Sequence, residues 1–437
     1  MFCSKFLKKA LATIFLVASI PTAIYSIPIN WSAQSSDDLN LNTNWNPPLV
    51  PTTGDVAIFD SFITGINTNP VGEGVDFLCS SFRFTFDASP FNITIKNQQL
   101  IFDGLGIIGN STDPTINLTN TNTPYVVSNQ IFFNGSLSTS GEATIIADNV
   151  SSITGSPATT YLSVIDRQVY SPNAFTMSNN GNITASNTGT DFSTGAGGNI
   201  SAGVFQGQAI FGDTCTVGDN CHMTVINNGL CASPVANNLA GYVLEWQLHS
   251  ADDFVAGDSF NLFVANAGID VSAGVGGQKT GIIASVSGTT GSQIEMDGEF
   301  RVGDVTNILV LNSGYFIGST STDPCESGTM LNEQVRIHGA FESGDLLNMT
   351  VLNEGRDSSQ SVGGNQIGMV PAAQLRCDSR VETGEFSSIT LVNFGYNIGT
   401  NAAPNISGEV SAEQIVINGA FQAEDFFTLS VVNDGTD

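Results

Sequence analysis

A unit of about forty residues recurs through the second half of the chain, and it constrains the fold more than any other feature. The unit is clearest in Gln334–Gly355, which reads QVRIHGAFESGDLLNMTVLNEG, and an asparagine near its end serves as an anchor. Successive anchors are 39, 46, 41, 40 and 40 residues apart. The anchors are Asn227, Asn266, Asn312, Asn353, Asn393 and Asn433.

Three further positions keep the register of these anchors. A glutamine stands nineteen positions before each one, at Gln208, Gln247, Gln293, Gln334, Gln374 and Gln414. An acid stands eight positions before, at Asp219, Asp258, Asp304, Asp345, Glu385 and Asp425, and a glycine precedes five of these six acids, with Glu424 as the exception. A glycine also follows each anchor by two positions. Such regularity is typical of repeats that bury their apolar faces against one another.

Within the unit, apolar residues alternate with a period of two, which indicates β-strands rather than helices. Val335, Ile337 and Phe341 share one face, and Leu347–Val351 repeats the pattern after a turn. Asn353 continues the inward-facing set, and a buried amide must be hydrogen-bonded. A column of stacked asparagines satisfies this requirement, as in other stacked strands.

These patterns predict an all-β protein, a right-handed parallel β-helix or β-solenoid built on repeats of about forty residues. We expect three strands per coil, the third being weaker, as in Gly281–Val286 or Gly408–Ser411. The alternative is a string of β-hairpins in separate small sandwiches, because the Glu-Ser-Gly-Asp turn also suits a hairpin loop.

The first 26 residues have the pattern of a secretory signal peptide. Lys5, Lys8 and Lys9 precede the apolar run Ala10–Ile20, which is too short to span a bilayer. Without those three bases the chain carries 12 − 3 = 9 bases against 40 acids, a net charge of 9 − 40 = −31. This charge repels phosphate backbones and anionic lipid, which argues against nucleic-acid partners and direct membrane insertion.

Residues 27–165 form a different β-rich region, predicted as a cap and the first coils. Its landmarks are the run from Asn44 to Phe59 (NWNPPLVPTTGDVAIF), the alternating segment Phe91–Ile95 and the run Leu100–Ser111 (LIFDGLGIIGNS). This arrangement resembles the N-terminal cap of autotransporter-like β-helical passenger proteins of Gram-negative bacteria, and the later repeats are similar to tandem arrays of chlamydia-like bacteria. The resemblance implies a β-helical surface protein. Because no membrane-barrel pattern occurs before Asp437, we expect the array to continue beyond this chain, or another system to export it.

Residues 166–204 are predicted as a transition into the array of 205–437. Asn179 looks like the anchor of a degenerate unit, 48 residues before Asn227, and Ser186–Gly198 is predicted as a long loop.

The cysteines suggest one candidate cross-link. In the repeat register Cys215 and Cys221 both face inward across one turn, so a disulfide between them is conceivable in an exported protein. The alternative is that each is a small core residue, as we expect for Cys377. A zinc site at Cys221 and His222 is not predicted, because no second ligand pair has zinc spacing.

The sequence gives little support to catalysis, and we expect no enzyme and no cofactor. His222, His249 and His338 each occupy a different position in their repeats, and the paired Asp252 and Asp253 adjoin a turn that acids commonly cap. The column of turn acids raises a weak possibility of Ca²⁺ binding. The alternative is that these acids cap backbone N–H groups.

The sequence therefore favours an exported structural or adhesive protein at the cell surface, in the outer membrane or outside the cell. Its expected partners are a host-cell or matrix component or other surface proteins. The alternative is a polysaccharide-acting or carbohydrate-binding β-helix, although Tyr315 and Tyr396 lie two repeats apart and no continuous aromatic platform is predicted. A third possibility is a virulence-associated passenger whose activity lies beyond residue 437.

Overall fold

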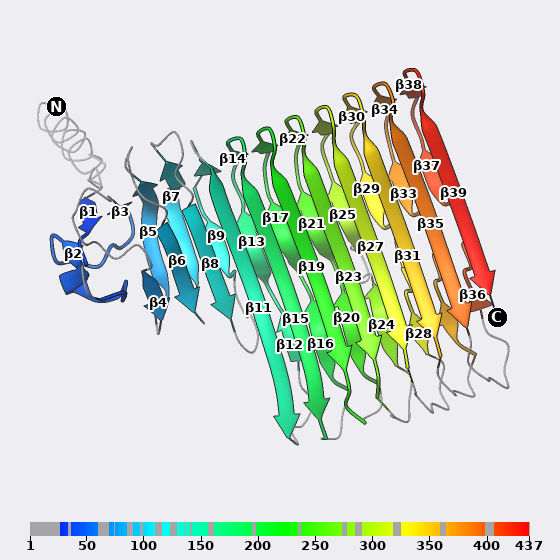
Figure 1. Ribbon diagram of the computed structural model, residues 1–437, viewed down its shortest axis with the longest axis horizontal. Helices are drawn as coiled ribbons and strands as arrows, with labels where there is room; N and C mark the ends of the chain where they lie inside the picture. Colours follow the sequence, from blue (N-terminus) through cyan, green and yellow to red (C-terminus); the bar gives the residue numbers. More distant parts are fainter. Residues whose placement is uncertain are drawn as a thin grey trace, which may run out of the picture.

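A computed structural model of the chain shows a parallel β-solenoid, in which successive coils stack along the long axis of the molecule (Figure 1). The structure describes residues 27–33, 36–59, 70–73, 75–84, 91–96, 99–109, 116–122, 129–135, 137–139, 142–155, 161–194, 198–234, 237–272, 278–284, 291–317, 325–358, 364–397 and 406–436. The predicted signal peptide, residues 1–26, lies outside these ranges. Within the described part of the chain, no helix is long and apolar enough to cross a membrane.

Four sheets run along the stack, and each coil gives one strand to each of them in the array. Sheet A, in spatial order, contains β2 (Trp45–Asn46), β1 (Pro28–Trp31), β3 (Val56–Phe59), β5 (Phe77–Phe84), β7 (Leu100–Gly109), β9 (Ile131–Phe133), β13 (Arg167–Ser171), β17 (Gly207–Phe211), β21 (Trp246–Ser250), β25 (Ser292–Met296), β29 (Val335–Ile337), β33 (Leu375–Cys377) and β37 (Ile415–Ile417). A short 3₁₀ helix, η1 (Asn42–Asn44), precedes β2.

Sheet D follows sheet A within each coil. Its strands are β10 (Leu137–Ser138), β14 (Phe175–Met177), β18 (Cys215–Val217), β22 (Phe254–Ala256), β26 (Phe300–Val302), β30 (Phe341–Ser343), β34 (Val381–Thr383) and β38 (Phe421–Ala423).

Sheet B carries the longest strands. They are β4 (Val71–Glu73), β6 (Phe91–Lys96), β8 (Ile116–Asn122), β11 (Ala143–Gly155), β15 (Asn182–Ser193), β19 (His222–Cys231), β23 (Asn261–Asp270), β27 (Asn307–Phe316), β31 (Asn348–Asp357), β35 (Ser388–Asn397) and β39 (Thr428–Thr436).

Sheet C completes each coil of the array. Its strands are β12 (Tyr161–Val164), β16 (Ile200–Val204), β20 (Leu239–Val243), β24 (Lys279–Ile283), β28 (Glu326–Ser327), β32 (Gln366–Ile367) and β36 (Ile406–Ser407).

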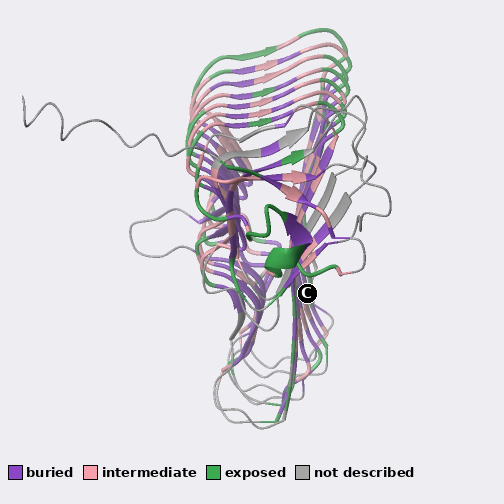
Figure 2. Ribbon diagram, turned by 90° about the vertical axis from the view of Figure 1, so that its left-hand side faces the viewer, coloured by how far each residue is buried: buried purple, intermediate pink, exposed green. Residues whose placement is uncertain are grey.

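The core is a continuous column between the sheets, and burial repeats at the same places from coil to coil (Figure 2). In β31 buried and partly exposed residues alternate along the strand, because successive side chains of a strand point to opposite faces. Phe341, Met349 and Val351 face this core. The alternation predicted from the sequence is therefore confirmed, and it places the outer faces of the sheets in solvent.

Each coil of the array has four strands, so the prediction of three was wrong. The turn His338–Ala340 separates Ile337 from Phe341, which lie in sheets A and D although both face the core. The weak strand predicted at Gly281–Val286 begins earlier, as β24.

The glycine that follows each anchor is required where sheets B and C approach each other. A side chain at Gly314 would meet the backbone nitrogen of Gly328, and Gly328 has a φ of +60°, which favours glycine. The same contact recurs from coil to coil, so the pair of glycines fixes how closely the two backbones pack.

The described residues 166–194 and 198–204 contribute β13, β14, β15 and β16, one strand to each sheet, as the coils of the array do. Asn187, and not Asn179, pairs with Asn227 across β15 and β19. The segment predicted as a loop, Ser186–Gly198, is strand through Ser193. The prediction failed because small polar residues are typical of loops. Here every second one is buried, in a strand that pairs with β11 on one edge and β19 on the other.

Candidate functional site

The anchoring asparagines form one hydrogen-bonded ladder through the interior. Each Nδ2 donates to the Oδ1 of the anchor in the next coil, at 2.8 to 2.9 Å from Asn187 through to Asn433. Asn227, Asn266 and Asn312 each donate also to a backbone carbonyl of sheet C. All the predicted anchors except Asn433 are fully buried, and Asn433 is exposed because it lies in the last coil. The buried anchors are thus bonded to one another along the stack and help to hold the fold together.

A second ladder explains the fixed spacing of nineteen residues. Each glutamine Nε2 donates to the Oε1 of the glutamine in the preceding coil, at 2.7 to 3.4 Å between Gln208 and Gln414. The same Nε2 donates to the carbonyl of the residue just before the anchor, at 2.7 to 3.0 Å. The glutamine of sheet A is thus tied across the core to sheet B.

The turn acids cap backbone N–H groups of the neighbouring coil. The Oδ1 atoms of Asp219, Asp258, Asp304 and Asp345 each accept the N–H of the next acid along the stack, at 2.7 to 3.0 Å. A side chain at the preceding glycine of the next coil would collide with this Oδ1. Of the six units, only the last lacks this glycine and has Glu424 in its place. That unit stacks on Glu385, which stands in place of an aspartate, so the difference is consistent with this packing. The acid column therefore has the structural role of the capping alternative, in which these acids accept backbone N–H groups.

The disulfide considered for Cys215 and Cys221 is not formed, and both thiols are buried and free. Cys215 occupies the core position of Phe175 and Phe254 in the adjacent coils. The Cys221 thiol points to the turn of the preceding coil, where its Sγ lies 3.2 Å from the carbonyl oxygen of Ser178. Burial raises the pKa of both thiols, which keeps them protonated. Cys377 is a buried core residue, as expected.

The structure brings His249 and His338 together on the outer face of sheet A. The sequence alone did not predict this cluster. His338 Nε2 lies 3.2 Å from Glu295 Oε1 and 3.7 Å from Asp297 Oδ1. His249 Nε2 lies 3.2 Å from Asp297 Oδ2 on the other side. We call Glu295, Asp297 and His338, with the groups that contact them, the histidine cluster. A signal for it existed, because His249 and Glu295 both follow a ladder glutamine by two positions, and Asp297 and His338 follow one by four.

Further groups hold the histidine cluster in place. Trp246 Nε1 donates to Glu295 Oε2 at 2.6 Å, and its ring stacks on His249 with centroids 4.4 Å apart. Asp378 Oδ2 lies 3.2 Å from His338 Nδ1. Burial opposes ionisation of Asp378, but the hydrogen bonds and positive charges that surround it, those of Arg376 first, together outweigh burial, so the pKa of Asp378 is below its ordinary value. Asp378 thus lies beside His338 Nδ1, while Nε2 of the same ring faces the carboxylates of Glu295 and Asp297.

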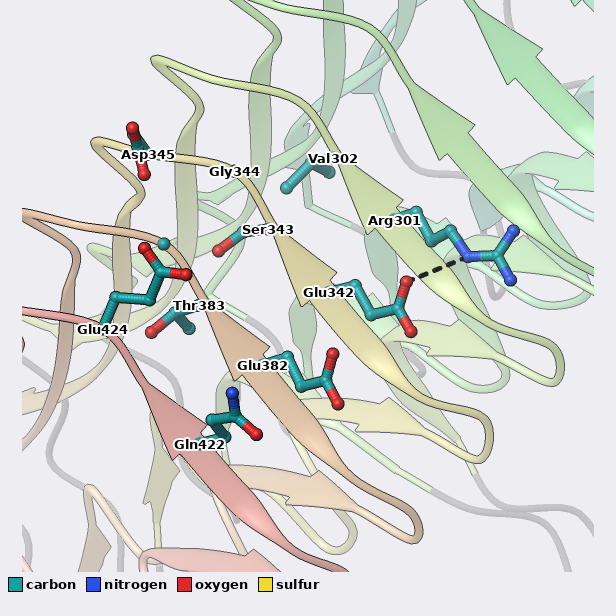
Figure 3. Close-up of a pocket in the computed structure, with 11 residues that line it drawn as sticks. Arg301, Val302, Glu342, Ser343, Gly344, Asp345, Glu382, Thr383, Gln422 and Glu424 are labelled. Atoms are coloured by element: carbon teal, nitrogen blue, oxygen red, sulfur yellow. Dashed lines mark ion pairs between the residues drawn. The ribbon is translucent and has the colours of Figure 1, made fainter.

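An open groove lies on the outer face of sheet D, beside the turn at Asp345 (Figure 3). Glu342, Glu382 and Gln422 occupy successive strands along it, and Arg301 approaches Glu342 with Nε 3.2 Å from Oε2. Arg380 Nε lies 3.3 Å from Glu382. Exposed ion pairs of this kind contribute little to stability. The groove is thus acidic, because four acids and one arginine line it, and Arg301 and the neighbouring Arg380 offset only part of its charge.

A smaller groove lies on the outer face of sheet B. Glu354, Arg356, Phe394, Tyr396 and Asp434 line it, and 45% of the surface of Tyr396 is exposed. Arg356 shares one column of sheet B with Tyr315 in the preceding strand and Tyr396 in the following strand. The outward positions here are thus more aromatic than the sequence suggested. Asp252 and Asp253, in contrast, lie in a turn where Asp253 Oδ1 accepts the N–H of Glu299 at 2.8 Å.

No family model matches the chain, and neither a curated protein nor a solved structure matches it.

Proposed function

We propose that the chain is an exported structural or adhesive protein of the cell surface, an elongated scaffold whose outer faces bind a host-cell component, a matrix component or another surface protein. The observation that carries this proposal is the contrast between the interior positions, which keep the fold, and the outward positions, which face solvent. The glutamine and asparagine ladders and the capping acids repeat through the coils of the array, and their polar groups bond to one another and to the backbone. Outward positions can differ from coil to coil, as in the column of Glu354, Phe394 and Asp434, although the column of Thr350, Thr390 and Ser430 changes little.

Variation in length is also confined to the connections. The additional residues of the 46-residue unit fall between β24 and β25, while strand pairing in sheets A, B and D is kept on both sides of them. A solenoid that tolerates insertions outside its ladders suits the presentation of variable binding surfaces. The basic and apolar pattern of residues 1–26 and the resemblance of Asn44–Ser111 to passenger caps support export.

Two experiments test the proposal. Residues 1–26 fused to a reporter that is active only after export should deliver the reporter, and replacing Lys5, Lys8 and Lys9 with glutamate should reduce delivery. The purified chain displayed on beads should adhere to one component of a panel of cell surfaces and matrix proteins, with little nucleic-acid or lipid binding. Retention of the reporter in the cytoplasm together with no adhesion would refute it.

The second candidate function is carbohydrate binding, and the groove of Phe394 and Tyr396 favours it. Aromatic rings beside carboxylates and an arginine offer both a stacking surface and hydrogen-bonding groups for sugars. Binding to a glycan array that is lost in Tyr396→Ala but kept in Thr390→Ala, a change on the same face, would favour this function over protein adhesion. We propose that neither function involves hydrolysis, since Asp252 and Asp253 serve as turn caps.

A further inference from the structure

The geometry of the histidine cluster points to a binding site for a divalent transition-metal ion, with Zn²⁺ as the expected type, ligated by Glu295, Asp297 and His338. One imidazole nitrogen and two carboxylate oxygens lie within 4.8 Å of one another. A tetrahedral zinc ion with bonds of about 2.0–2.1 Å holds its donor atoms about 3.3 Å apart. The distances from His338 Nε2, 3.2 Å to Glu295 and 3.7 Å to Asp297, match this requirement before any ion is added.

Each of the three ligands has its own orienting partner. Trp246 holds the second oxygen of Glu295, His249 holds the second oxygen of Asp297, and Asp378 holds the second nitrogen of His338. Metal-binding histidines almost always have such a carboxylate or carbonyl on the other ring nitrogen, which fixes the ring and its tautomer. A cluster formed only to neutralise charge has no need for a separate partner on every ligand.

Burial is graded across the site in a way that suits a metal ion with an open position. The residue Glu295 is only 4% exposed, whereas the side chains of His338 and Asp297 are 32% and 44% exposed. The buried carboxylate forms the floor, and the exposed side leaves the fourth position to water or to a group from outside. Glu295 lies in β25, Asp297 in the turn after β25, and His338 in the turn after β29, so the ion would join two adjacent coils on the outer face.

The ligand types select among ions. Imidazole suits Zn²⁺ and related transition metals, while Ca²⁺ and Mg²⁺ prefer oxygen ligands alone. This selectivity separates the site from a generally acidic surface, which would attract hard cations equally.

The test uses tag-free full-length protein stripped with a chelator and titrated calorimetrically with Zn²⁺, with Co²⁺ as a spectroscopic probe. We expect one ion per chain, a Co²⁺ visible absorption that Zn²⁺ abolishes, and no competition from excess Ca²⁺ or Mg²⁺. His338→Gln should remove this binding. Asp378→Asn, which removes an orienting partner, should weaken it by about 10- to 100-fold.

The matched control is His222→Gln, because His222 is exposed on sheet B and belongs to no part of the cluster. It should bind Zn²⁺ like the unaltered protein. Asp297→Asn provides a second ligand variant at an exposed side chain, should His338→Gln fold poorly. Equal Zn²⁺ binding in the unaltered protein and in a folded His338→Gln or Asp297→Asn variant, or an equal loss in His222→Gln, would overturn the assignment.

Discussion

The N-terminal coils and the array after them fill the same kind of interior by different means. In the first coils aromatic rings meet edge to face, as in Trp31 against Trp45 with centroids 5.0 Å apart and Phe82 against Phe102 at 4.9 Å. In the array, amide ladders cross the interior and smaller side chains such as Val351 and Met349 pack between them.

The difference shows what a regular register requires. Aromatic packing depends on shape, so it tolerates the antiparallel pairing of β1 with β2 and the shift of register between Cys79 and Ser81. A ladder needs the same amide at the same position in every coil, because each group donates to its neighbour. Among the described side chains, the glutamine ladder is first seen at Gln130 and the asparagine ladder at Asn149, and the packing changes there.

The largest effect should come from the aromatic interior of the first coils. Phe82 is fully buried and contacts Phe59, Phe77 and Phe102. Phe82→Ala should lower the free energy of unfolding by about 3–5 kcal/mol, since it removes a buried ring and leaves a cavity. In the array, Phe341→Ala should fall in the same range of about 3–5 kcal/mol, because its ring stacks on Phe300. Denaturant midpoints measure both, and an unchanged midpoint for either would contradict the assigned packing.

Replacing the buried acid Asp270 should raise the free energy of unfolding, by less than the loss of a buried ring lowers it. Burial raises the pKa of Asp270 from 3.8 to about 6, and its Oδ2 has no hydrogen-bond partner. Because the pKa is raised on folding, ionisation destabilises the folded state: the penalty is absent below pH 3.8 and complete above about pH 6. A shift of about two units corresponds to about 3 kcal/mol.

Asp270→Asn should therefore stabilise the protein by up to about 3 kcal/mol at pH 8 and give no gain near pH 4. Asparagine already occupies the same position in the coil of Asn397. Melting curves across this pH range check the result. A gain that is independent of pH would show that packing, and not the buried charge, causes it.

Interrupting a ladder should cost less than removing a ring. Asn312 donates to Asn353 and to the carbonyl of Gly281, and it accepts from Asn266. Asn312→Ala leaves these buried groups without their partner, and the expected loss is about 2–3 kcal/mol. Asn307→Ala, an exposed change in the same strand, is the control. Similar losses in the two variants would contradict the ladder as a source of stability.

The smallest effect is expected at Ser343, in the strand that also carries Phe341. Its hydroxyl is buried without a hydrogen-bond partner, so Ser343→Ala should change stability by less than about 0.5 kcal/mol. A loss as large as that of Phe341→Ala would contradict the description of this strand.

Much of the array could be predicted because its determinants recur in the sequence. The position of Asn353, the turn at Asp345 and the inward face of Phe341 follow from register and alternation alone. The coil of Asn187 was missed because its residues are small and polar, and their inward role depends on neighbouring coils. The histidine cluster was missed because its members come from four coils, so only the stacking of positions brings His249, Asp297 and His338 together.

The central claim is that the coils stack in parallel with every position in register, and distances between spin labels test it most directly. His222, Asn348, Ser388 and Thr428 share one position on sheet B, and the last three lie three, four and five coils from His222. Labels paired between residue 222 and each of the other three should give distances that grow by about 4.8 Å per coil. Distances that do not increase in equal steps would show separate hairpin sandwiches and contradict the solenoid.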